Sequence, residues 1–216
     1  MNAPFKADPA GFLTRYINIQ SSNFAARRAD GTAILNYALN RDYVGSFDIR
    51  PGARQGMANL YQHDGGWFTE SAINAYYLNA LTDLTVQIPI TNKADHFFTD
   101  TITGCAFMAW GTNRHNLTVL HANVLNIGKK EYMKKALQVR ALRPPFLIIY
   151  TYQDYQQGVL AGEDPSMVVT TVCGKRLADG WHFYTRSYIG ITGVVHGMGV
   201  MQPRGLQPTG VEIQPD

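Results

Sequence analysis

Cysteine is nearly absent from this 216-residue chain. Only Cys105 and Cys173 are present, so the sequence has neither a disulfide framework nor enough thiolates for a structural zinc site. The two residues could form a single bridge, but a reducing compartment is the simpler interpretation. The role of each thiol must therefore be inferred from its surroundings.

Charged residues are also scarce, at 16% of the chain, and the net charge is only +3. Lysine and arginine are scattered, apart from small groups at 129–130, 134–135 and 140–143. This distribution is too weak to predict nucleic-acid binding. Hydrophobic residues make up 45%, which is typical of a globular protein rather than a disordered one.

Long apolar runs are missing as well. No segment approaches the length of a membrane span, and the N-terminal residues MNAPFKADPAGF lack the basic start and apolar run of a signal peptide. We expect a soluble monomer without a classical signal peptide and with no membrane partner. If the protein leaves its cell, it would do so by a non-classical route.

Short runs rich in β-branched and aromatic residues dominate the rest of the chain, and Gly, Asn, Asp and Pro separate them. The predicted strands are 12–19, 32–39, 43–49, 84–90, 105–110, 117–121, 146–152, 167–173, 181–188 and 193–201. Residues 1–11 and 202–216 are predicted to be loose arms of a single domain spanning 1–216. The glycine-containing stretch 51–67 is interpreted as a surface loop, although it could line a substrate groove.

Two helices are predicted from apolar residues at helical spacing. One covers 70–81 with Thr69 as its N-cap, and the other covers 129–142 before Pro144 and Pro145. Asp179 and Gly180 form a turn dipeptide between two predicted strands. The predicted fold class is α/β: a mainly antiparallel sheet or sandwich flanked by a few helices.

The segment FFTDTITGCAFMAWGTNRHNLTVLHANV, residues 97–124, combines a cysteine with two histidines. If its two strands pair as a hairpin with a turn near 111–116, Cys105 and His121 lie near the same open end, where their side chains could meet. A thiol beside an imidazole is the minimum nucleophile–base pair. Gly104 would leave room for a substrate carbonyl to reach backbone N–H groups that can stabilise an oxyanion.

Structural roles are the alternative for each of these residues. A cysteine among apolar residues is commonly a small core residue, and a histidine at a strand end can simply bond a backbone carbonyl. Cys173 is interpreted as structural. His182 and His196 have no partner at metal-ligand spacing, so a metal site that includes His63 or His96 is a remote alternative.

The residues FFTDTITGC (97–105) resemble the segment of the Burkholderia lethal factor glutamine deamidase that carries a threonine, five intervening residues and then the cysteine. TVLHAN (118–123) resembles the strand of that toxin that carries the histidine. Cytotoxic necrotising factor toxins and the chemotaxis deamidase CheD share the Cys–His arrangement with variable spacing. The resemblance departs at Thr103, where serine is usual, and in a Cys-to-His connection that is longer than in the lethal factor.

This resemblance implies a fold similar to the catalytic domain of cytotoxic necrotising factor, and it implies Cys105 as nucleophile, His121 as base and Thr99 as the third residue. Thr99 would accept the other imidazole N–H and fix the tautomer. The implied reaction is hydrolysis of a protein glutamine side chain to glutamate, with no metal or organic cofactor. The implied partner is a host protein, such as a GTPase or a translation-initiation helicase, reached by a toxin delivered into the host cytosol.

Four alternatives remain open at this point. One is a protease, which would need a long cleft for an extended substrate chain. The same thioester could be captured by an amine, which would make the protein a transglutaminase. The chain could instead be a β-rich binding module that uses its tyrosine, phenylalanine and tryptophan side chains, with Cys105 and His121 structural. His115 could replace His121 as the base, although a position in the turn would leave it exposed and too far from Cys105.

Overall fold

The computed structural model describes residues 1–16, 18–21, 41–52, 56–63, 71–80, 84–123, 129–155, 168–189 and 195–200. The helices are α1 (Asn2–Ala7), α2 (Pro9–Arg15), α3 (Lys129–Ala141) and α4 (Tyr152–Tyr155). The strands are β1 (Asn18–Ser21), β2 (Val44–Pro51), β3 (Met57–Gln62), β4 (Ile73–Leu78), β5 (Thr85–Ile90), β6 (His96–Thr99), β7 (Ala106–Asn113), β8 (Asn116–Ala122), β9 (Phe146–Tyr150), β10 (Val168–Leu177), β11 (Gly180–Ile189) and β12 (Val195–Val200).

These strands form two sheets. The larger sheet has the order β1-β3-β2-β4-β6-β10-β11-β12, and the smaller has the order β5-β8-β7-β9. Pairing is antiparallel except between β1 and β3 and between β4 and β6, which are parallel. The fold is therefore mainly β with few helices, in agreement with the sequence-based fold class at this level.

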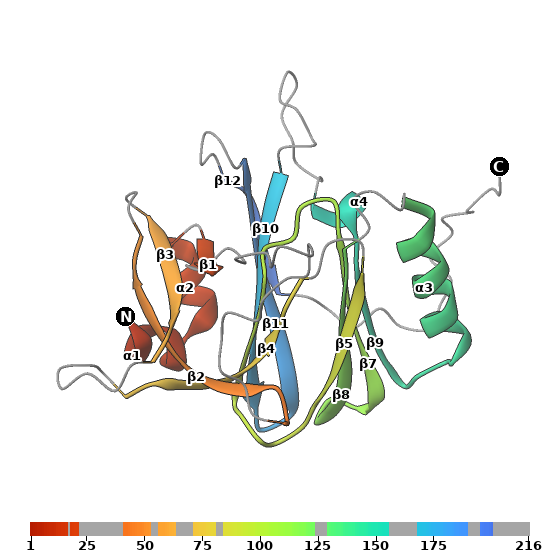
Figure 1. Ribbon diagram of the computed structural model, residues 1–216, viewed down its shortest axis with the longest axis horizontal. Coiled ribbons are helices and arrows are strands. Elements are labelled where there is room, and N and C mark those ends of the chain that lie inside the picture. Colours follow the sequence, from red (N-terminus) through yellow and green to blue (C-terminus); the bar gives the residue numbers. More distant parts are fainter. Residues whose placement is uncertain are drawn as a thin grey trace, which may run out of the picture.

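The two sheets pack face to face between helices (Figure 1). Alternate residues of the strands from β4 to β11 meet in the layer between the sheets, where Phe97, Phe107, Val172 and Phe183 are buried. On the outer face of the large sheet, Phe5 of α1 and Phe12 of α2 pack on the strands, and Val139 of α3 covers the small sheet. The order of layers is helix, large sheet, small sheet, helix.

The chain passes from the large sheet to the small sheet directly after β6. Residues 100–105 make this crossing, and Ile102 forms an isolated bridge with Thr170 of β10 through two backbone hydrogen bonds of 2.8 and 2.9 Å. Cys105 lies at the end of the crossing, one residue before β7. The candidate nucleophile therefore lies on the segment that joins the two sheets.

The N-terminal predictions were wrong. Residues 1–11 are not a loose arm, because α1 and the start of α2 lie there and Phe5 is fully buried. The predicted strand 12–19 begins as helix, since Asp8 caps α2 by accepting from the backbone N–H of Gly11, and Pro9 stands at the first helical position. Helix capping outweighed the β propensity of the residues that follow.

The predicted helix 70–81 was also wrong, because its centre is the strand β4. Ile73, Ala75 and Tyr77 pack under α1 and α2, whereas Tyr76 and Leu78 face the small sheet. A strand that is buried on both faces reads as a nearly continuous apolar run, in which helical spacing also occurs. Periodicity could not separate the two structures.

The interpretation of 51–67 as a loop missed β3, which pairs with both β1 and β2. β6 was missed as well. The predicted helix 129–142 is confirmed as α3, and so are the predicted strands from 84–90 to 193–201, with ends that differ by one to several residues. The turns near 111–116 and at Asp179-Gly180 are also confirmed. The predicted strand 146–152 is shorter in the structure, because β9 ends at Tyr150. The predicted strand 32–39 and the predicted arm 202–216 lie outside the described residues.

Candidate functional site

Thr99 and His121 meet between the two sheets. Thr99 ends β6 on the large sheet, and His121 lies near the end of β8 on the small sheet. Thr99 Oγ1 and His121 Nδ1 are 2.9 Å apart, and both side chains are buried. The packing of the sheets therefore brings together two of the residues singled out in the sequence.

The hydrogen bonds of Thr99 define the tautomer of His121. The Thr99 hydroxyl donates to the backbone carbonyl of Leu78 at 2.8 Å, so its oxygen can only accept from the imidazole. Nδ1 of His121 then carries the proton and Nε2 carries the lone pair. Nε2 is buried and has no hydrogen-bond partner among the described residues.

Burial also sets the charge of this imidazole. His121 is 0% exposed, and desolvation lowers its pKa from 6.5 to about 4. The ring is therefore neutral at neutral pH. A neutral imidazole with a bare Nε2 can accept a proton, which is what a general base must do.

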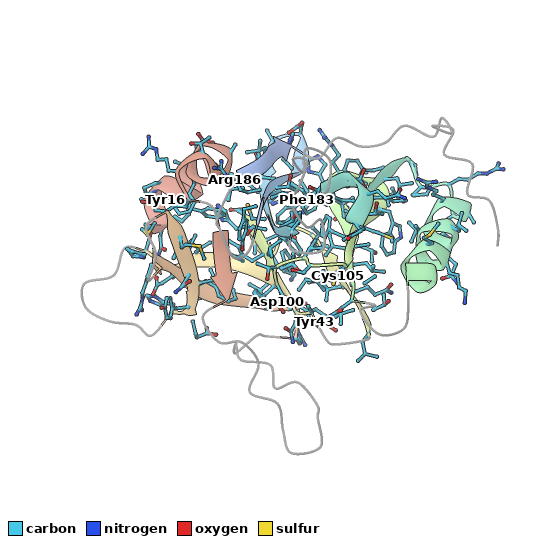
Figure 2. All side chains as sticks on the ribbon, turned by 90° about the horizontal axis from the view of Figure 1, so that it is seen from above. Tyr16, Tyr43, Asp100, Cys105, Phe183 and Arg186 are labelled. Atoms are coloured by element: carbon cyan, nitrogen blue, oxygen red, sulfur yellow. The ribbon has the colours of Figure 1, made fainter. Side chains whose placement is uncertain are left out.

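Cys105 lies on the same face of the small sheet as this imidazole. Phe107 of β7 is paired with His121, and Cys105, two residues before Phe107, belongs to the same buried layer. Positions related in this diagonal way typically have Cα atoms roughly 7–8 Å apart. Figure 2 shows Cys105 near the middle of the molecule, between the helical layers.

The residue Cys105 is 4% exposed, and its thiol donates from Sγ to the backbone carbonyl of Thr103 at 3.4 Å. Between them, Gly104 has a φ of 72°, in the left-handed region that glycine adopts without strain. The glycine therefore has a conformational reason for its position besides the space predicted for a substrate. It turns the chain sharply just before the cysteine.

Asp100 bonds the same Leu78 carbonyl that accepts from the Thr99 hydroxyl. Its backbone N–H donates to the Leu78 carbonyl at 3.3 Å, and its carboxylate accepts from the Tyr77 hydroxyl and from the backbone N–H of Ala80 at 2.7 Å. Burial raises the pKa of this carboxyl group, and these two donors offset the rise in part. Asp100 was not predicted from the sequence, although an acidic residue directly after an aromatic run was a visible signal.

The remaining candidates lie away from this arrangement. His115 is exposed in the hairpin turn, where its backbone N–H donates to Asn113, and β7 separates it from Cys105 by about 27 Å of strand. Cys173 is fully buried on the opposite face of the large sheet, and burial raises the pKa of its thiol. The two cysteines do not form a disulfide.

His96 and His182 also have local explanations. The ring of His96 lies 5.7 Å from that of Phe5 under the helices, and His182 bonds Asp179 at 2.7 Å on the surface. In the described part of the chain, no three His, Cys, Asp or Glu side chains gather as metal ligands do. No described helix is long and apolar enough to span a membrane.

No known protein family matches the sequence, and no curated protein does.

Proposed function

We propose that the protein is a cysteine-dependent glutamine deamidase that converts a glutamine side chain of a protein substrate to glutamate. The observation that supports this best is the hydrogen bond between Thr99 and His121, which leaves the bare Nε2 of a neutral imidazole on the face that carries Cys105. This is the base side of a Cys–His–Thr triad, with the threonine in the orienting role.

In the first half of the reaction, Nε2 of His121 accepts the thiol proton and the Cys105 sulfur attacks the carboxamide carbon of the substrate. Thr99 continues to accept from Nδ1–H, so the imidazolium that forms stays oriented. The imidazolium then protonates the leaving nitrogen. The carbon–nitrogen bond breaks, ammonia departs, and a thioester remains on Cys105.

In the second half, His121 takes a proton from water, and the hydroxide formed attacks the thioester carbon. The carbon–sulfur bond breaks, the thiolate regains its proton from the imidazolium, and the product is glutamate. Each cycle consumes one water and releases one ammonia. Backbone N–H groups near Gly104 and Cys105 contribute hydrogen bonds to the oxyanion in both halves.

The residue pattern of 97–123 supports the choice of glutamine, since it resembles the lethal factor and cytotoxic necrotising factor deamidases. On that basis the fold is similar to the catalytic domain of the latter toxins, and the substrate is a host protein, such as a GTPase or a translation-initiation helicase. The protein would act as a virulence toxin after delivery into the host cytosol by a non-classical route.

A second candidate function is a β-rich binding module, and burial favours it. His121 is 0% exposed and Cys105 is 4% exposed, as in structural core residues. In that case the bond between Thr99 and His121 serves only to join the sheets. The two functions differ in the reactivity expected of Cys105.

The test uses wild type, Cys105→Ser and Cys173→Ser, each incubated with a eukaryotic lysate in water enriched in heavy oxygen. Mass spectrometry then searches for glutamines converted to glutamate that carry the heavy isotope. Cys173→Ser is the matched control, because it removes the other thiol and leaves the site intact. A fluorescent primary amine in a parallel reaction separates deamidation from transglutamination.

The proposal expects isotope-labelled glutamate with wild type and Cys173→Ser, and none with Cys105→Ser. Incorporation of the amine in place of water would make the protein a transglutaminase. Identical lysates for all three proteins, together with a Cys105 thiol that resists alkylation in the folded protein, would establish the binding module instead.

A further inference from the structure

Four hydroxyl groups gather at one end of the layer between the sheets. Thr170 Oγ1 and Ser187 Oγ are 2.8 Å apart on neighbouring strands of the large sheet. The hydroxyls of Ser187, Thr185 and Thr170 also lie close enough to the phenol of Tyr150, on the small sheet, to lower its pKa. We call Tyr150, Thr170, Thr185 and Ser187 the hydroxyl cluster.

The cluster flanks the candidate nucleophile on the side opposite the imidazole. Phe107 pairs with His121 of β8 on one side and with Tyr150 of β9 on the other. Cys105 lies two residues from Phe107 on the same face, so His121 and Tyr150 occupy equivalent diagonal positions about it. His121 and Tyr150 therefore lie on the two strands that flank β7, the strand that Cys105 precedes.

The cluster also contacts the loop that carries the cysteine. Thr170 forms the backbone bridge with Ile102, three residues before Cys105. Tyr150 is half-buried, whereas Thr170, Thr185 and Ser187 are no more than 5% exposed. The phenol thus reaches from a partly accessible edge of the small sheet toward a fixed set of hydroxyls.

The surroundings of the cluster are apolar. Phe107 packs against Phe183, labelled in Figure 2, with ring centroids 5.1 Å apart, and Val172 is buried beside them. Burying hydroxyls in such a layer costs free energy unless each is hydrogen-bonded. Four of them in the same layer as Cys105 and His121 form a polar group that apolar packing alone does not require.

We propose that Tyr150 binds the primary carboxamide of the substrate, donating its hydroxyl to the carbonyl oxygen that becomes the oxyanion when Cys105 attacks. This inference rests on the proposed function, and it deepens it by assigning a second side of the site. Thr170, Thr185 and Ser187 position the phenol. His121 handles protons on the opposite side of the same carbon.

The protonation of the phenol suits this role. Burial raises the pKa of Tyr150, and the hydroxyls of Ser187 and Thr185 offset that rise only in part. The phenol therefore keeps its proton at neutral pH. The neighbouring hydroxyls can donate to the phenol oxygen while its own O–H donates to the carbonyl oxygen of a bound substrate.

Two small thiol reagents test the subsite. Iodoacetamide carries a primary carboxamide next to its reactive carbon, whereas methyl methanethiosulfonate carries none. In a Cys173→Ser background, Cys105 alone reports the rate with each reagent. Tyr150→Phe is expected to lower the rate at which Cys105 reacts with iodoacetamide about tenfold, because one hydrogen bond to the carboxamide is lost. The rate with methyl methanethiosulfonate should not change.

Ser187→Ala provides a second variant, because it keeps the phenol and removes one of its partners. The ratio of the iodoacetamide rate to the methyl methanethiosulfonate rate should fall less in Ser187→Ala than in Tyr150→Phe. Urea unfolding of each variant shows that the protein is folded under the labelling conditions. These measurements use the complete chain.

The inference is overturned if Tyr150→Phe changes both rates in parallel, since the tyrosine would then act only through packing, or if it changes neither. Those outcomes leave the proposed function standing, because Cys105 would still react in the folded wild type. A wild-type Cys105 that reacts with neither reagent overturns this inference, and together with lysates that the wild type leaves unchanged it overturns the proposed function as well.

Discussion

Thr99 on the large sheet and His121 on the small sheet are joined by a hydrogen bond of 2.9 Å between Oγ1 and Nδ1. The same hydroxyl donates to the Leu78 carbonyl at 2.8 Å. Thr99 therefore connects the backbone of one sheet to the imidazole of the other. The bond both orients the candidate base and closes the layer between the sheets.

Replacing Thr99 with valine removes this connection and keeps the volume similar. We expect a loss of about 1–3 kcal/mol in the free energy of unfolding, because the Nδ1–H of His121 loses its partner in a buried layer and the Leu78 carbonyl loses one of its two donors, keeping the backbone N–H of Asp100. Deamidase activity should fall further than stability accounts for. Urea unfolding and the glutamate assay measure the two effects.

Thr99→Ser is the matched control, since it keeps the hydroxyl and removes one methyl group. It should retain most of the activity. If Thr99→Val and Thr99→Ser lose activity equally, the hydroxyl does not orient the imidazole.

The two buried histidines make stability depend on pH. Burial lowers the pKa values of His121 and His96 from 6.5 to about 4. Both rings are neutral in the folded protein, whereas the unfolded chain binds protons below pH 6.5. The stability that this gives, as free energy of unfolding, is fully present above pH 6.5 and is lost as the pH falls through about 4. At pH 5 each ring has already lowered the free energy of unfolding by about 2 kcal/mol.

Urea midpoints measured between pH 7 and pH 4 check this dependence. His121→Gln and His96→Gln should each flatten the curve, and the double variant should flatten it most. A double variant with the slope of the wild type would show that other groups control the acid sensitivity.

The two thiols should differ in reactivity. Cys173 is 0% exposed under the helices, and burial raises its pKa, so it should react only from unfolded molecules, which are typically a fraction of about 10⁻³ or less. Cys105, at the crossing between the sheets, should be alkylated by iodoacetamide in the folded protein. Peptide mapping after timed labelling measures both rates, and equal rates would contradict the assignment.

Gly104 should tolerate asparagine better than alanine. Its φ of 72° costs an L-amino acid about 1–2 kcal/mol, and asparagine accepts this region more readily than alanine does. Gly104→Ala should therefore lower both stability and the alkylation rate of Cys105, with Gly104→Asn in between. A thermal unfolding series ranks the three proteins, and an unaltered Gly104→Ala would show that the turn relaxes without cost.

The candidate site was more predictable from sequence than the topology around it. Cys105 and His121 occur on one predicted hairpin, so local pairing alone places them on the same face. The role of Leu78 could not be predicted, because it depends on parallel pairing between β4 and β6. From the sequence, β4 was predicted to be a helix and β6 was not predicted.

Tyr150 and Ser187 illustrate the same difficulty. They lie on different sheets and are far apart in the chain, and neither residue type attracts notice within a strand. Their meeting depends on how the sheets pack, and no local pattern encodes it. Hairpin pairing is a short-range property, whereas sheet packing depends on the whole core.

The crossing at residues 100–105 has a consequence for folding. His121 belongs to one sheet, Thr99 to the other, and Cys105 to the segment between them. A nascent chain with a single completed sheet would contain every residue of the proposed triad, yet it should remain inactive. The proposed deamidase activity should thus return late during refolding, so that its recovery reports when the two sheets dock.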